Sequence, residues 1–170
     1  MAPPSSTRRR TPRPLKVTSP RKMPGVGLGV LLRNADMIFN RALREELARH
    51  DFTFSQFQHL WQLFGSDGLT QVDLSHRIGI EAASSTAVID QLEKRRLIRR
   101  ERDTADRRRI NVTLTSAGRA LEKPLTACAM RVNKLARHGL SNAEIDALFT
   151  SVNRVIRNLQ TRGTQRSRDE

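Results

Sequence analysis

The 170-residue chain has one cysteine, no tyrosine and few aromatic residues of any kind. The single cysteine, Cys128, excludes an internal disulfide bond, which fits a reducing compartment such as the cytoplasm. Aromatic residues make up only 4% of the chain, whereas modules that bind RNA or single-stranded DNA stack bases on aromatic side chains. The composition therefore argues against that class of binder.

Long apolar runs are absent as well. No stretch approaches the roughly 20 apolar residues of a membrane-spanning helix, and the basic N-terminus lacks the apolar core of a secretory signal. There is no glycine-rich phosphate loop, no Ser/His/Asp arrangement, no cluster of carboxylates and no histidine pair at metal-ligand spacing. We therefore expect a cytoplasmic protein that contacts no membrane, is not an enzyme, and holds neither a metal nor a cofactor.

Positive charge dominates what the chain does contain. Its 31 Lys and Arg residues outnumber its 17 Asp and Glu residues, giving a formal net charge of +14. The charge is concentrated between Lys94 and Arg109, where KRRLIRRERDTADRRR holds nine basic residues against three acids. A clustered charge of this sign favours a polyanionic partner over a merely solvated basic surface.

Both ends of the chain are polar. Residues 1–24 hold six of the seven prolines, seven basic residues and no acid, so we expect a disordered basic N-terminal arm. This arm is either inert or follows DNA phosphates and adds non-specific affinity. Residues 161–170 are expected to form a flexible tail.

Hydrophobic periodicity between these ends predicts a mainly α-helical fold with one small β-hairpin. Two capping boxes, Thr53–Gln56 and Ser141–Glu144, mark helix starts, and Pro124 should kink or break the helix that contains it. The expected helices cover 25–50, 53–65, 70–79, 82–95, 115–138 and 141–160, and the expected strands cover 98–102 and 110–114.

Two short helices joined by a tight turn and followed by a basic hairpin are typical of a winged helix-turn-helix domain, here residues 53–114. Such a domain places its second helix in the major groove of DNA, while the hairpin reaches the backbone or the minor groove. The flanking helices of 25–52 and 115–160 carry more apolar surface than a monomer of this size could bury. We expect them to form a helical dimerisation region.

Small and polar residues gather on the outward side of the predicted second helix. Small side chains allow close approach to the groove floor, and hydroxyls or methyl groups can contact phosphates or base edges. The alternative is that this run is only a weak helix start chosen for capping. The residues expected to contact DNA are Ala83, Ser84, Ser85, Thr86 and Gln91.

Several segments together resemble the MarR family of bacterial transcription regulators. They are SSTAVIDQLEKRRLIRR, RDTADRRR and INVTLTSAGRAL, and the likeness extends over about residues 25–160. Its most specific parts are Asp103, Asp106, Arg107 and Arg108 in the hairpin, followed by Leu-Thr-x-x-Gly ending at Gly118. The resemblance implies a homodimer that binds a pseudo-palindromic double-stranded operator, with half-sites about one helical turn, ~34 Å, apart.

The resemblance also implies roles in the wing. Asp103 and Asp106 are expected to stiffen the hairpin by pairing with arginines, and Arg107, Arg108 and Arg109 to contact phosphates or a narrow minor groove. Two positions depart from the family pattern. Arg96 replaces a glycine that normally ends the recognition helix, so it must accept a positive φ or end the helix differently. Ala87 replaces an arginine, which removes one base contact.

Family members often release DNA when a small aromatic acid or phenol binds between the dimerisation and winged-helix regions. The candidates for such a pocket are Met37, Arg41, His59, Trp61, Cys128 and Arg131. For three of them a packing role is the competing interpretation: His59 as a core histidine bonded to a carbonyl, Trp61 as a core aromatic, and Cys128 as a small apolar residue rather than a peroxide sensor.

The sequence thus predicts a sequence-specific, double-stranded-DNA-binding transcriptional regulator, expected to be a repressor released by a small organic effector. Two alternatives remain open. The first is a ligand-independent architectural DNA-binding protein that uses its basic arm. The second is a winged-helix module for protein interaction or RNA association.

Overall fold

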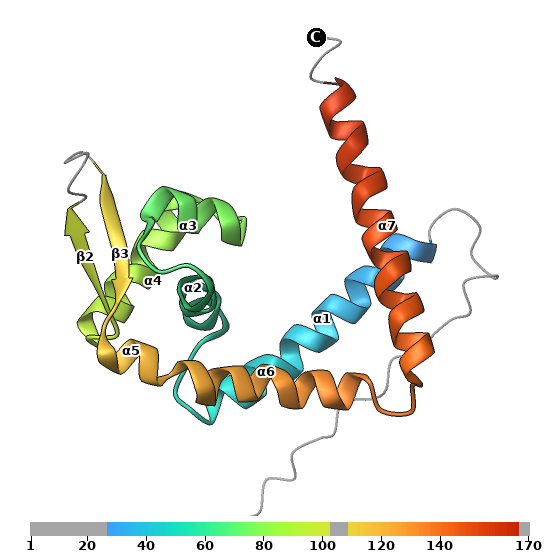
Figure 1. Cartoon of the computed structure of the whole chain (residues 1–170), viewed down its shortest axis with the longest axis horizontal. Coiled ribbons are helices and arrows are strands. Elements are labelled where there is room, and N and C mark those ends of the chain that lie inside the picture. The colour runs from blue at the N-terminus through green and yellow to red at the C-terminus, as the bar shows by residue number, and fades with distance from the viewer. Residues whose placement is uncertain (1–26, 103–108, 167–170) are drawn as a thin grey trace, which may run out of the picture. The chain divides into compact units, whose positions relative to one another are not determined.

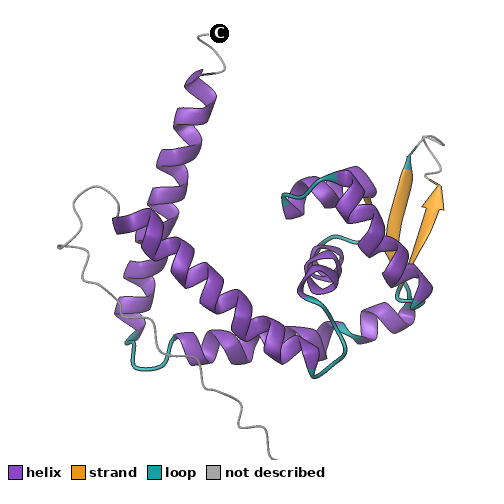
Figure 2. Cartoon of the chain, turned by 180° about the vertical axis from the view of Figure 1, so that it is seen from behind, coloured by secondary structure: helices purple, strands orange, loops and turns teal. Residues whose placement is uncertain are grey.

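The computed structural model describes residues 27–102 and 109–166, with side chains to residue 161. The chain divides into two units within its first helix, between Met37 and Ile38. The elements in chain order are α1 (Gly27–Ala48), α2 (Phe54–Gly65), β1 (Leu69–Thr70), α3 (Gln71–Ile78), α4 (Ala82–Lys94), β2 (Ile98–Arg102), β3 (Ile110–Leu114), α5 (Ser116–Ala120), α6 (Glu122–Ala136) and α7 (Asn142–Arg166) (Figure 1). The structure is therefore mainly helical with a small sheet, as predicted (Figure 2).

Local sequence signals set the helix ends of the winged-helix region. The Thr53–Gln56 capping box is present, with both the Thr53 side chain and the Gln56 side chain bonded to backbone N–H groups. Thr70 caps α3 by accepting from the N–H of Asp73, and Gly79 ends it with φ 76°. Because only glycine adopts that conformation without strain, the turn from α3 into α4 is sharply defined.

The sheet has three strands in the order β1-β3-β2, all antiparallel. The predicted hairpin is confirmed at its described positions, with Ile98 opposite Leu114 and Arg102 opposite Ile110. Strand β1 was not predicted, because two residues are too few to show an alternating pattern. It pairs Leu69 with Val112 and so attaches the start of α3 to the wing.

One hydrophobic core joins the winged-helix elements to α6 and the second half of α1. Its fully buried side chains come from α1, α2, α3, α4, β2, β3 and α6. They include Leu47, Leu60, Leu63, Leu74, Ile89, Leu92, Val112 and Leu125. Burial of a side chain of this size contributes about 1.5–3 kcal/mol, so this core fixes how α4 is presented.

The predicted break near Pro124 occurs at Leu121, which separates α5 from α6. Pro124 then lies in the first turn of α6, where a missing N–H costs no helical hydrogen bond. Just before the break, α5 lies against the start of β2. A Cβ built on Gly118 would lie 2.0 Å from the carbonyl oxygen of Leu97, so this position has room only for glycine.

The last helix is longer than predicted. Helix α7 continues through Arg166, so the expectation of a flexible tail from residue 161 is wrong for residues 161–166. Its predicted capping box is present, since Ser141 and Glu144 exchange side-chain and backbone hydrogen bonds. Large apolar side chains remain exposed on α6 and α7: Met130, Leu135, Leu148, Phe149, Ile156 and Leu159.

Among the described residues, none of the helices combines the length and apolar character needed to span a bilayer. The basic arm of residues 1–24 and the ends of the chain beyond residue 166 lie outside the described residues.

Candidate nucleic-acid interface

Helix α4 is packed on one side and open on the other. Its inner side buries Ile89 and Leu92 completely. On the outer side Ala83, Ser84 and Ala87 are exposed, at spacings that place them along one face. Figure 1 shows α4 between α3 and the β2–β3 hairpin, the arrangement in which a helix-turn-helix presents its second helix.

Ser85 does not belong to the outer face. Its side chain is fully buried, and its Oγ lies 3.0 Å from Nε2 of His59 on α2. The expectation that Ser85 points outward to DNA is therefore wrong. The residue instead fastens α4 to the helix beneath it.

His59 is the buried partner in this contact. Its Nδ1 lies 2.7 Å from the carbonyl oxygen of Ser55, one turn earlier on α2. Burial lowers the pKa of His59 below its usual value, while the Ser55 carbonyl opposes the shift. A neutral ring satisfies both contacts when Nδ1–H donates to Ser55 and Nε2 accepts from the Ser85 hydroxyl.

A second side-chain bond joins the same two helices. Nε2 of Gln56 donates to Oε1 of Gln91 over 3.1 Å, and Gln56 is itself buried. Gln91 is exposed on α4, as predicted, but half of its amide is already engaged in this contact. Helix α2 therefore fixes α4 near both ends.

Helix α3 supplies a third bond, at Thr86. Nε2 of Gln71 donates to Oγ1 of Thr86, and the Thr86 hydroxyl donates to the carbonyl oxygen of Ala82 over 2.9 Å. Thr86 is half-buried rather than fully outward. Its polar group is thus used within the protein.

The wing is tied to α4 by one arginine. The guanidinium of Arg100 on β2 forms salt bridges with both Asp90 and Glu93, and its backbone N–H donates to Glu93 over 3.1 Å. Partial burial by itself lowers the pKa of Arg100, but the hydrogen bonds and charges of Asp90 and Glu93 together outweigh it and hold the pKa above its usual value. The double pairing fixes the direction in which the hairpin leaves α4.

Only part of the predicted wing contact surface can be placed. Arg109 is exposed, and its Nη2 lies 3.5 Å from a carboxylate oxygen of Asp73 on α3. The pKa of Asp73 is lowered, first by the hydrogen bond from Thr70 and also by the charge of Arg109. Asp103, Asp106, Arg107 and Arg108 lie outside the described residues.

Arg96 accepts the strained conformation at the end of α4. Its φ is 57°, in the left-handed region, and its N–H donates to the carbonyl oxygen of Glu93 over 2.8 Å. Its own carbonyl oxygen accepts from the Thr115 hydroxyl. Of the two expected outcomes, Arg96 thus accepts a positive φ, which costs about 1 kcal/mol of stability relative to glycine.

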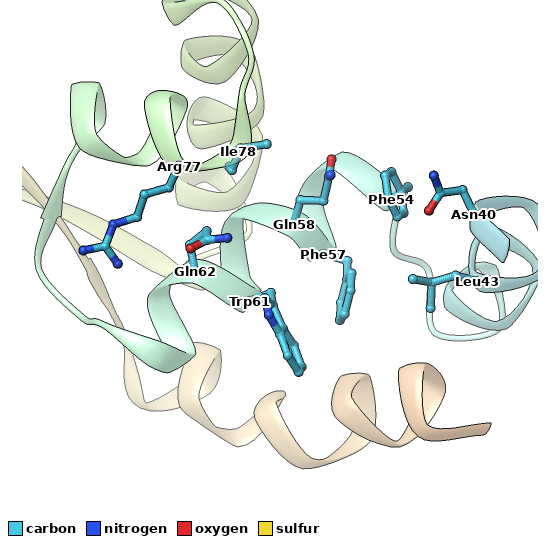
Figure 3. Close-up of a pocket in the computed structure, with 9 residues that line it drawn as sticks. All are labelled: Asn40, Leu43, Phe54, Phe57, Gln58, Trp61, Gln62, Arg77 and Ile78. Atoms are coloured by element: carbon cyan, nitrogen blue, oxygen red, sulfur yellow. The ribbon is translucent and has the colours of Figure 1, made fainter. Parts of the chain in front are cut away.

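A cavity of about 280 Å³ lies between α2, α3 and the second half of α1 (Figure 3). Aromatic side chains from α2 line it together with one cation from α3. The lining residues are Asn40, Leu43, Phe54, Phe57, Gln58, Trp61, Gln62, Arg77 and Ile78. Figure 3 shows Arg77 and Gln62 at one end and the rings of Trp61 and Phe57 along α2.

Of the six residues predicted to bind an effector, only Trp61 lines this cavity. Trp61 is 46% exposed, and its ring centroid lies 5.6 Å from that of Phe57, so the interpretation of Trp61 as a core residue is wrong. The core interpretation is correct for His59. Met37 and Arg41 are exposed on α1.

Cys128 and Arg131 form a separate cluster on α6. Cys128 is fully buried, in agreement with a packing role. Arg131 pairs with Glu46 of α1 over 2.6 Å, and its other nitrogen lies 3.2 Å from the Cys128 sulfur. The hydrogen bond from Arg131 lowers the pKa of Glu46, so this cation is already paired.

The sequence did not point to three residues that shape the face of α4 or the cavity: Gln71, Arg77 and Arg100. Only Arg100 left a signal, because Asp90 and Glu93 one turn apart on a helix favour a basic partner across from them. Gln71 and Arg77 lie on α3 with no pattern that relates them to α4 or α2. Within the described part of the chain, no three His, Cys, Asp or Glu side chains gather to hold a metal ion.

Comparison with known proteins identifies the family to which this architecture belongs. The MarR family profile matches residues 52–110, which run from two residues before α2 to the first residue of β3. A solved structure of Bordetella bronchiseptica BpsR, described as regulated in its DNA binding by 6-hydroxynicotinic acid, is 30% identical. It superposes with a TM-score of 0.68 over 75% of this chain and 97% of BpsR. The chain belongs to the MarR family.

Two curated relatives carry regulator names. The HTH-type transcriptional regulator TtmR of Methylorubrum extorquens is 33% identical over 49% of this chain, a match that spans only 43% of TtmR. The HTH-type transcriptional repressor NicR of Pseudomonas putida is 26% identical over 76% of this chain and 82% of NicR. Both relatives are thus named as helix-turn-helix regulators of transcription.

Proposed function

We propose that this MarR-family chain is a sequence-specific regulator of transcription that binds double-stranded DNA through α4. The observation that carries the proposal is the division of α4 into a fully packed face and an open face of Ala83, Ser84 and Ala87. Small side chains on a helix that precedes a basic hairpin suit close approach to base edges. We place this regulator in the cytoplasm and assign it no enzymatic activity.

We propose that a second copy of the chain covers the exposed apolar face of α6 and α7. Phe149 and Leu159 are 60% and 68% exposed, which supports this proposal, because a soluble monomer rarely leaves a large apolar patch in water. A twofold dimer would bring two α4 helices to successive major grooves, and Arg107, Arg108 and Arg109 to the flanking backbone or minor groove.

Competition binding tests the proposal. The purified chain is titrated against a fluorescent duplex from its own upstream DNA at about 0.15 M salt, with excess random duplex present. A specific regulator should prefer its site by about a thousandfold or more and bind as two subunits per site. Equal affinity for random duplex would instead favour the architectural alternative, and preference for RNA or an acidic protein would favour the interaction module.

We further propose that the protein is a repressor, and that the cavity between α2 and α3 takes a small aromatic acid whose binding releases it from DNA. Trp61 and Phe57 offer ring faces, and Arg77 offers a cation, whose charge also helps to lower the pKa of Asp73 on the same helix. Arginine is well suited to hold a carboxylate through two parallel hydrogen bonds. The 6-hydroxynicotinic acid in the description of the BpsR structure belongs to this chemical class.

Fluorescence of Trp61, the only tryptophan of the chain, reports on the cavity directly. Titration with 6-hydroxynicotinate or benzoate should quench it, whereas benzamide, which lacks the charge, should bind at least about tenfold more weakly. Arg77→Gln should abolish that difference, and Arg137→Gln, an exposed arginine at the end of α6, should preserve it. Equal binding of acid and amide would exclude Arg77 as the anchor.

A further inference from the structure

The hydroxyl of Thr86 is committed inside the protein. It donates its only proton to the carbonyl oxygen of Ala82 and accepts a proton from the amide of Gln71. A hydroxyl has one proton to donate and two lone pairs to accept with. One acceptor position therefore remains, and no donor.

This arrangement limits what Thr86 can contact on DNA. Phosphate oxygens, both acceptors of guanine, N7 of adenine and O4 of thymine all require a donor, which Thr86 lacks while both bonds stand. What remains is one acceptor position, which matches only the amino donors of adenine and cytosine, and the methyl group. Because Oγ1 is held from two sides, rotation about Cα–Cβ is fixed and the methyl keeps one orientation.

The neighbouring positions on α4 have the same character. Ala83 and Ala87 are exposed, and they lie three residues before and one residue after Thr86. The outer face of α4 thus offers methyl groups at three positions. In the major groove, the feature that matches an apolar methyl is the C5-methyl group of thymine.

Gln71 is placed firmly enough to impose this arrangement. It is the first residue of α3, immediately after the N-cap Thr70, whose hydroxyl donates to the Asp73 carboxylate over 2.6 Å. Thr70 also pairs with Asn111 of β3. The start of α3 is thus fixed by a cap and by the sheet, and Gln71 reaches from there to α4.

We infer that Gln71 is a positioning residue for base recognition: it keeps the Thr86 hydroxyl away from DNA, so that α4 reads thymine methyl groups with Ala83, Thr86 and Ala87. The inference rests on the proposed role of α4 in the major groove. It gives α3 a part in specificity without any contact between Gln71 and a base.

The test uses the duplex selected by the wild-type chain, with each thymine replaced in turn by deoxyuridine, which lacks only the C5-methyl. At one or more positions per half-site the affinity should fall about fourfold, the value expected for one buried methyl. Thr86→Val keeps the methyl and loses the hydroxyl, so replacing thymine by deoxyuridine should lower its affinity at every such position, as in the wild type. Thr86→Ser keeps the hydroxyl and loses the methyl, so at one of these positions deoxyuridine should bind this variant as well as thymine does.

Gln71→Leu tests the positioning role. Without the Gln71 amide, the Thr86 hydroxyl is held by the Ala82 carbonyl alone and can rotate more easily. Gln71→Leu should therefore change the thymine preference in the wild-type background and leave it unchanged in the Thr86→Val background, where there is no hydroxyl to hold. Equal effects in both backgrounds, or a preference kept by Thr86→Ser and lost by Thr86→Val, would overturn the inference. Specific binding with no deoxyuridine effect would overturn this inference and leave the proposed function intact. Failure to prefer any duplex would overturn the proposed function as well.

Discussion

Nε2 of His59 lies 3.0 Å from Oγ of Ser85, in a contact that joins the fully buried side of α4 to α2. Both groups are completely removed from solvent, and both have hydrogen-bond partners. A histidine that lies beneath the recognition helix with a lowered pKa makes the stability of the winged-helix region depend on pH.

The predicted pH dependence follows from the direction of that shift. Because the pKa of His59 is lower in the folded state than the 6.5 of a free histidine, the unfolded chain binds the proton more readily. This contribution to stability is complete above about pH 6.5 and is lost as the pH falls from there towards the folded pKa. The loss should approach about 1.4 kcal/mol per pH unit, measured by urea unfolding at fixed protein concentration.

A matched histidine provides the control. His138→Gln changes an exposed histidine at the end of α6 and should leave the slope below pH 6.5 intact, whereas His59→Gln should reduce it. If His59→Gln is too unstable to measure, NMR titration of the wild-type imidazole decides. A His59 ring that titrates at or above 6.5 would contradict the account.

Relief of backbone strain at the end of α4 should stabilise the protein. Arg96→Gly removes a side chain from a residue with φ 57°, so the free energy of unfolding should rise by about 1 kcal/mol. Arg137 is an exposed arginine at the end of α6 with an ordinary φ of −86°, so Arg137→Gly should lower stability instead. Thermal unfolding of the two variants measures the difference, and a loss in both would show that the conformation of Arg96 is not strained.

The close contact at Gly118 predicts a large loss from a single methyl group. Gly118→Ala would place a Cβ against the backbone of Leu97, and either α5 or the start of β2 must move. Overpacking of this kind costs about 1–3 kcal/mol. Gly65→Ala adds the same methyl where no atom lies within 4 Å, so it should be nearly neutral. Comparable unfolding midpoints for the two variants would refute the contact.

Loss of the double salt bridge of Arg100 should affect DNA binding more than stability. Arg100→Met releases Asp90 and Glu93 together, yet partly exposed pairs contribute only about 1 kcal/mol or less to folding. The freed hairpin should bind a specific duplex several-fold more weakly, by fluorescence anisotropy. Arg99→Met, which breaks the exposed pair with Glu101, serves as the control, and equal losses would mean that only charge matters.

The elements with a periodic hydrophobic pattern or with capping residues could be predicted from the sequence. Both strand ranges of the hairpin are correct, as are the caps of α3, because alternation and capping residues are local signals. The end of α7 was missed since a formed helix continues through polar residues at little cost. Polarity alone therefore did not mark the end of the helix.

The site was predicted less completely, for a different physical reason. Ser85 lies four residues before Ile89 and seven before Leu92, a spacing that belongs to the buried face. Its polar type suggested the surface, and the histidine that satisfies it is 26 residues away in the sequence. The Gln71–Thr86 bond and the cavity beside Arg77 likewise depend on how helices pack, which no local pattern encodes.

Selection of bound duplexes from a random pool tests the central claim, that two α4 helices read duplex DNA, most directly. The account predicts a single enriched motif with twofold symmetry, whose half-sites are centred about one helical turn, ~34 Å, apart. It also predicts that Ser84→Glu, which adds a negative charge to the open face of α4, removes this enrichment without loss of folding. A pool that stays random after selection, or a motif unaffected by Ser84→Glu, would contradict it.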